Sequence, residues 1–165
     1  MNILVLCTGN SARSILAEAI FNRLGDDRLT AYSAGSKPVG AVNPVALRLL
    51  EDEGYDIGSF RSKSWDEFSD AEAPELDLVV TVCGNAAGET CPVWIGAPVT
   101  VHWGFPDPAA VEGSEQDKLV AFRKVYQGLV NNVSALLALD LESLNAENLR
   151  TALLEIHATA EPVTF

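Results

Sequence analysis

The stretch VLCTGNSARS, residues 5–14, follows an apolar run at residues 2–6 and decides the fold. A short continuous apolar run of this kind is typical of a strand that is buried on both faces of a sheet. Helix formers and apolar residues recur from Ser11 to Leu24, and Gly25 ends that pattern. The intervening residues are therefore either an ordinary turn, or a loop that wraps around a tetrahedral anion with Cys7 as its nucleophile.

Strands and helices alternate along the rest of the chain. Asn43 followed by Pro44 is a typical helix start, because the asparagine side chain caps the first N–H groups and proline suits the first helical position. Further strands are predicted at residues 29–33, 76–82 and 98–102, and helices at 44–53, 115–139 and 142–158. This order predicts a single-domain α/β fold with a four-stranded parallel sheet flanked by helices. Residues 1–139 form its body, and 140–165 are an extra C-terminal helical extension.

Composition narrows the classes of function. The chain has 165 residues, 23 acidic and 11 basic, with a formal net charge of −12. Since no cluster of Lys and Arg is present to neutralise phosphates, we expect no nucleic-acid binding. No apolar segment is long enough to span a membrane, and no signal-peptide pattern is visible. We therefore expect a cytoplasmic protein whose three cysteines, Cys7, Cys83 and Cys91, form no structural disulfide framework.

The segment from Cys7 to Ser14 has the chemistry of an oxyanion site. Five residues separate Cys7 from Arg13, enough backbone to wrap N–H groups around one anion. Gly9 and Asn10 tolerate the backbone angles that such a nest requires, and the arginine offers a planar fork for two oxygens. The same donors should lower the pKa of the Cys7 thiol. The predicted substrate-binding residues are Thr8, Gly9, Asn10, Ser11, Ala12, Arg13 and Ser14.

The Cys-x5-Arg-Ser pattern resembles the signature of the low-molecular-weight protein tyrosine phosphatase fold. The chain most resembles the thioredoxin-coupled arsenate reductases built on that fold. This resemblance covers about residues 2–139, through the stretches CTGNSARS, YSAGSKPVGAVNPVA, VVTVCGNAAGETCPVW and HWGFPDPA. Such reductases often carry a cysteine just before the loop arginine, where this chain has Ala12. The resemblance ends before the tail that begins at Asp140.

Two further cysteines favour reduction over hydrolysis. Cys83 follows a predicted strand, and Cys91 lies eight residues later across a segment of small residues. Reduction of arsenate to arsenite takes two electrons, which two thiols supply when they form a disulfide. A metal pair or two unreactive thiols are the alternatives, although no histidine or further cysteine lies nearby at ligand spacing. The resemblance implies a relay in which Cys7 attacks arsenate, Cys83 attacks Cys7, and Cys91 attacks Cys83.

Asp107 lies between Pro106 and Pro108 and resembles the general acid of the family. Its role would be to protonate the departing oxygen. Tyrosine phosphatases of this fold commonly have tyrosines after this Asp-Pro pair, where this chain has Ala109 and Ala110. The absence of tyrosines fits a small inorganic substrate.

The resemblance also bears on cofactors and partners. No cofactor is required, but some related reductases bind potassium beside the loop. Asn10, Glu18 and Ser33 match the positions of its ligands, and Asp66 matches approximately. The expected ligands are arsenate and, more weakly, phosphate or sulfate. The expected reductant is thioredoxin, with glutaredoxin and glutathione as the alternative, and we expect no membrane partner.

Two other functions fit the same residues. One is a protein tyrosine or small-molecule phosphatase in which the extra cysteines protect Cys7 from oxidation. The other is an oxyanion- or redox-sensing binding module that acts through its tail helix. Steady-state production of arsenite distinguishes the reductase from both, and efficient hydrolysis of an aryl phosphate favours the phosphatase.

Overall fold

A four-stranded parallel sheet with β1 at an inner position forms the centre of the molecule. The computed structural model describes residues 1–90 and 92–165, so the predicted site residue Cys91 lies outside the described residues. The strands are β1 (Asn2–Cys7), β2 (Thr30–Gly35), β3 (Leu78–Thr81) and β4 (Val99–His102). They lie in the order β2-β1-β3-β4, and each neighbouring pair is parallel. The predicted α/β fold is confirmed.

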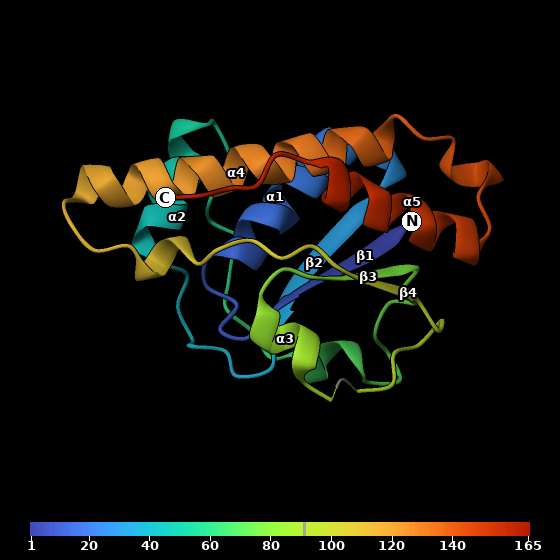
Figure 1. Ribbon diagram of the computed structural model, residues 1–165. Coiled ribbons are helices and arrows are strands. Elements are labelled where there is room, and N and C mark those ends of the chain that lie inside the picture. Colours follow the sequence, from blue (N-terminus) through green and yellow to red (C-terminus); the bar gives the residue numbers. More distant parts are fainter. Residues whose placement is uncertain (91) are drawn as a thin grey trace.

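Helices cover the sheet on both faces. The α-helices are α1 (Arg13–Gly25), α2 (Pro44–Asp52), α3 (Gly84–Gly88), α4 (Glu115–Leu137) and α5 (Ala146–Thr159). Short 3-10 helices are η1 (Asp26–Arg28), η2 (Trp65–Phe68), η3 (Pro108–Ala110) and η4 (Leu141–Ser143). Figure 1 shows α1, α2, α4 and α5 together on one side of the sheet and α3 on the other. Within the described residues, no helix is both long and apolar enough to cross a membrane.

The side chains of β1 alternate between two cores. Ile3 and Val5 point into the larger core with α1, α4 and α5, while Leu4 and Leu6 point into a smaller one. The smaller core is completed by residues from irregular segments, Phe68, Leu76 and Trp94 among them. Burial on both faces explains why this strand is an uninterrupted apolar run.

The C-terminal extension packs onto the sheet. The indole nitrogen of the fully buried Trp103 donates a hydrogen bond to the carbonyl oxygen of Leu153 at 2.9 Å. Arg150 donates to the carbonyl oxygen of Thr100 in β4 at 3.1 Å. The division at residues 139 and 140 stays a prediction, but α5 shares the larger core with the body of the fold.

The main local difference from the sequence prediction is the start of α1. The helical pattern begins at Ser11, whereas the helix begins at Arg13. The preceding residues instead form a loop: Asn10 has a φ of 44°, and Ala12, with φ −130° and ψ −86°, also lies outside the right-handed helical region. The next helix agrees with the prediction, since the Asn43 side chain accepts a hydrogen bond from the Val45 N–H at 2.9 Å.

Candidate active site

The segment from Cys7 to Ser14, here called the anion loop, joins β1 to α1 and is held from outside through its carbonyl groups. The carbonyl oxygens of Thr8, Gly9 and Ser11 accept hydrogen bonds from the backbone N–H groups of Lys37, Val39 and Asn43 at 2.8–3.0 Å. The Ser62 hydroxyl donates to the Gly9 carbonyl as well, at 3.1 Å. Because these carbonyls are held from outside, the loop can direct its N–H groups toward an anion, as in a backbone nest.

Asn10 holds the loop from within. Its side chain is fully buried and donates to the hydroxyl groups of Ser14 and Ser33, both at 2.9 Å. Its side-chain oxygen accepts a hydrogen bond from the N–H of Lys63 at 2.9 Å. Asparagine tolerates the left-handed backbone angle found here better than most residues. The predicted loop residue Asn10 is therefore an anchor for the loop backbone.

Gly35 lets the end of β2 approach the loop. A Cβ atom at this position would lie 2.5 Å from the Thr8 carbonyl oxygen and 3.0 Å from the Asn10 nitrogen. Only glycine fits such a contact with backbone atoms. Gly35, the last residue of the sequence YSAG, is thus required by the close packing of β2 against the loop backbone.

The loop opens into a cleft of about 260 Å³ at the carboxyl end of the sheet. The cleft is lined by Cys7, Thr8, Gly9, Asn10, Ser11, Ala12, Arg13, Val39, Cys83, Asn85, Asp107 and Ala109. It unites the loop, both described cysteines and the predicted acid, which come from three separate strand ends. The sequence analysis did not name Val39 and Asn85 as site residues, although both lie in stretches that resemble the family, because only the folded chain brings them to the cleft. The buried Ser14 contributes behind the loop, through its bond to Asn10.

Arg13 is oriented for an anion from two sides. One terminal nitrogen, Nη1, donates to the carbonyl oxygen of Phe105 at 2.8 Å. The other, Nη2, lies 3.6 Å from the carboxylate of Asp107, which is on the exposed side of the cleft. The Nε of Arg13 is buried and has no hydrogen-bond partner among the described residues. The arginine therefore keeps a donor for an oxyanion while it holds the predicted acid close by.

The two described cysteines are free, buried and hydrogen-bonded to each other. Cys83 follows β3 and accepts hydrogen bonds from the N–H groups of Thr8 and Ala86, each at 3.4 Å. The Thr8 hydroxyl lies 3.5 Å from the same sulfur. These donors and the thiol of Cys7 together lower the pKa of Cys83 to about 4, with Cys7 the largest cause.

The thiol pair differs from the sequence prediction for Cys7. The hydrogen bond to Cys83 and then burial raise the pKa of Cys7, although Arg13 and the N–H of Thr8 act in the predicted, lowering direction. The two thiols therefore shift in opposite directions, and the hydrogen bond between them is the largest cause of both shifts. The sequence did not reveal this, because nothing in it shows that the two sulfurs touch.

The predicted potassium ligands come together only in part. Asn10, Ser33 and Glu18 form a hydrogen-bonded chain behind the loop, in which the Ser33 hydroxyl donates to the Glu18 carboxylate. Asp66 lies apart, exposed on η2. The ammonium group of Lys63 lies 3.7 Å from the Glu18 carboxylate, so these residues do not fit a further cation there. Elsewhere in the described chain, no group of three or more His, Cys, Asp or Glu side chains can hold a metal ion.

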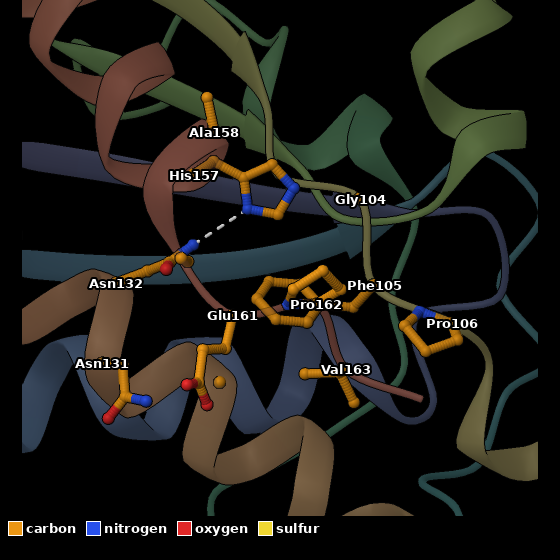
Figure 2. A pocket seen from close by; sticks show the side chains of 12 residues that line it. Gly104, Phe105, Pro106, Asn131, Asn132, His157, Ala158, Glu161, Pro162 and Val163 are labelled. Carbon is orange, nitrogen blue, oxygen red and sulfur yellow. Dashed lines mark hydrogen bonds between the residues drawn. The ribbon is translucent and has the colours of Figure 1, made fainter. Parts of the chain in front are cut away.

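A second pocket, of about 230 Å³, lies between Phe105, α4 and the C-terminal segment (Figure 2). The rings of Phe105 and His157 pack with their centroids 5.5 Å apart. The Asn132 side chain donates to Nδ1 of His157 at 3.1 Å, the contact drawn as a dashed line in Figure 2. Since the carbonyl of Phe105 holds Arg13, this packing supports the acid loop from behind.

Comparison with known proteins finds relatives on this fold. The sequence profile of the low molecular weight phosphotyrosine protein phosphatase family matches residues 2–150. An arsenate reductase from Halalkalibacterium halodurans is 42% identical over 123 residues, 74% of this chain and 85% of that protein. A solved arsenate reductase in the reduced state has a TM-score of 0.64 and 27% identity, covering 83% of this chain and 96% of that one. A solved low molecular weight protein tyrosine phosphatase from T. tengcongensis has a TM-score of 0.65 and 24% identity, and the match covers 87% of this chain and 99% of the phosphatase chain.

Proposed function

The chain belongs to the low molecular weight phosphotyrosine protein phosphatase family, and we propose that it is an arsenate reductase of that family. The observation that carries the proposal is the second free thiol, Cys83, hydrogen-bonded to Cys7 inside the anion cleft. Hydrolysis of a phosphate ester needs one nucleophile, and a neighbouring thiol takes no part in that reaction beyond protecting the nucleophile from oxidation. Two-electron reduction of an oxyanion requires a second thiol within reach of the first.

In the first step arsenate binds to the loop N–H groups and to Arg13. The proton of Cys7 passes to the arsenate dianion, and the Cys7 sulfur attacks arsenic. A sulfur–arsenic bond forms while an arsenic–oxygen bond breaks, and Asp107 protonates the departing oxygen to give water. The position of the Asp107 carboxylate, 3.6 Å from Nη2 of Arg13, supports this role.

In the second step Cys83 attacks the sulfur of Cys7. The sulfur–sulfur bond forms, and the electron pair of the sulfur–arsenic bond goes to arsenic, which is thereby reduced from the pentavalent to the trivalent state. Protons from water complete arsenite. The donors around Cys83, the N–H groups of Thr8 and Ala86, keep its pKa low and so supply the thiolate that this attack requires.

In the third step Cys91 attacks Cys83, which frees Cys7 and leaves a Cys83–Cys91 disulfide. A dithiol protein must then reduce this disulfide, and we propose thioredoxin, with glutaredoxin and glutathione as the alternative source of electrons. Such reductants keep thiols reduced in the cytoplasm, which is the compartment that we propose for this protein. The cysteine positions and the sequence around Cys91 support this step.

A comparison of three variants tests the relay. After one turnover with arsenate, we expect Cys7→Ser to release no arsenite and Cys83→Ser to stop at an arsenic adduct of Cys7. Cys91→Ser should release about one arsenite per chain and then hold a Cys7–Cys83 disulfide that peptide mapping detects. Arsenite production by wild-type protein over many turnovers, measured once with thioredoxin and once with glutaredoxin and glutathione, identifies the reductant.

The phosphatase alternative is tested with the same preparations. Hydrolysis of an aryl phosphate by wild-type protein, with no arsenite production in either reductant system, would replace the reductase by a phosphatase. Full activity of Cys83→Ser in arsenate reduction would show that the proposed relay is wrong. Ala109 and Ala110, which offer no aromatic surface beside Asp107, support the smaller substrate.

A further inference from the structure

A charged pair lies buried directly behind the anion loop. The side chain of Lys63 is 7% exposed and that of Glu18 is 16% exposed, with the ammonium nitrogen 3.7 Å from the carboxylate. Burial raises the pKa of Glu18 and lowers the pKa of Lys63, and each opposes the shift of the other through its charge. Removing two charges from water is costly, so a pair in this position needs a reason other than stability.

The pair is connected to the loop by two routes. Along the side chains, the Glu18 carboxylate accepts a hydrogen bond from Ser33, whose hydroxyl accepts one from Asn10. Along the backbone, the N–H of Lys63 donates to Asn10 at 2.9 Å. Asn10 is thereby bonded on one side to the chain that ends at Glu18 and on the other to the backbone of Lys63. Asn10 in turn helps to hold the loop backbone from within.

The chemistry of the corner is that of a monovalent cation site. Glu18 supplies a carboxylate, and Ser33 supplies a hydroxyl group. The carbonyl oxygen of Arg61 accepts a hydrogen bond from the Lys63 ammonium group at 3.3 Å. An ammonium group carries the same charge as a potassium ion and is likewise satisfied by oxygen atoms. Because it is tethered to the chain, it incurs no translational entropy cost of binding.

We propose that Lys63 is a built-in cation, whose ammonium group takes the place of a potassium ion beside Glu18 and positions the anion loop. Anion affinity then depends on Lys63 and is independent of dissolved potassium. The effect concerns the geometry of the loop before any reaction. It therefore stands or falls separately from the arsenate reductase proposal.

Phosphate binding tests the proposal without reference to catalysis. The dissociation constant for inorganic phosphate and the melting temperature are measured in potassium chloride and in choline chloride at equal ionic strength. Wild-type protein should give the same values in both salts. Lys63→Ala should bind phosphate about 10- to 100-fold more weakly in choline, the range known for outer partners that orient a site. Potassium or methylammonium should restore much of the affinity and raise the melting temperature of this variant.

Matched variants separate the cation from general effects of mutation. Lys118→Ala removes a lysine on α4 that lies outside the cleft, and its phosphate affinity should equal that of wild type in both salts. Lys63→Ala combined with Glu18→Gln removes the carboxylate that would hold an added ion, so potassium should not restore the phosphate affinity of this double variant. If Lys63→Ala does not fold, Lys63→Met keeps the length of the side chain without its charge. It should bind phosphate weakly in either salt.

Two results would overturn the proposal. The first is a potassium-dependent phosphate affinity or melting temperature in wild-type protein, since a built-in cation leaves no role for a dissolved one. The second is wild-type phosphate affinity in choline for Lys63→Ala, or for Lys63→Met where the alanine variant does not fold.

Discussion

Replacement of Asn10 by alanine is the sharpest test of the loop architecture. The substitution removes three hydrogen bonds, to Ser14, to Ser33 and from the N–H of Lys63, all in a fully buried environment. At about 1 kcal/mol net for each bond, the loss is roughly 3 kcal/mol. Alanine also tolerates the φ of 44° poorly, which adds about 1 kcal/mol. We expect a total loss of about 4 kcal/mol.

The two contributions can be measured separately by urea and thermal unfolding. Asn10→Gly loses the same hydrogen bonds but accepts the left-handed angle, so it should lose about 3 kcal/mol. For a chain of this size each kcal/mol corresponds to about 2–4 °C, so Asn10→Ala should lower the melting temperature by about 8–16 °C. Phosphate should protect either variant less than wild type. A loss below about 1 kcal/mol in both variants would refute the account of Asn10 as the anchor of the loop.

Three further predictions concern the cleft and its support. Phosphate at about 100 times its dissociation constant should stabilise wild-type protein by about 2.7 kcal/mol, and Arg13→Ala should abolish most of this shift in thermal unfolding. An equal shift in both proteins would exclude Arg13 from the anion site. Asp107→Asn should keep phosphate affinity but slow formation of the Cys7 adduct by about 10²- to 10⁴-fold in rapid-quench assays, and an unchanged rate would remove it from the mechanism. The pKa of His157 is lowered from 6.5, mainly by burial and also by the charge of His102, while a hydrogen bond with the backbone of Gly104 acts in the opposite direction. His157 therefore binds a proton more readily in the unfolded chain than in the folded one. This contribution to stability is complete above about pH 6.5 and is lost as the pH falls through the folded value. The urea midpoint of wild type should therefore fall more steeply below pH 6.5 than that of His157→Gln, and parallel curves would contradict this reasoning.

The regular elements and the loop could be predicted because their signals are local. The apolar run of β1, the cap at Asn43 and the spacing of Cys7 and Arg13 each lie within a few residues. The arrangement of strand ends followed from the rule that parallel strands present their carboxyl ends at one edge. These signals were enough to bring Cys83 and Asp107 to the same cleft.

The features that the sequence did not reveal all depend on contacts between distant residues. Lys63 comes 45 residues after Glu18 in a stretch, FRSKSW, that carries no recognisable pattern. The opposite pKa shifts of the two thiols arise because the side chains of Cys7 and Cys83 are hydrogen-bonded to each other. The docking of α5 includes a bond from Trp103 to the carbonyl of Leu153 and one from Arg150 to the carbonyl of Thr100. No local pattern predicts such pairings, because each needs the assembled fold.

The position of β1 in the sheet has a consequence for biosynthesis. Ile3 pairs with Ala31 on one side and with Leu78 on the other, so during synthesis the second edge of β1 stays uncovered until β3 has been made. When β2 has been made, the whole Cys-x5-Arg motif is already present, yet the strand on the other edge of β1 is still missing. Until then one edge of β1 has unpaired backbone N–H and C=O groups beside apolar side chains that are not yet covered, which is the kind of surface that chaperones shield. Cys7 is thus synthesised 76 residues before Cys83 and 100 residues before Asp107, so the cleft around it is completed late.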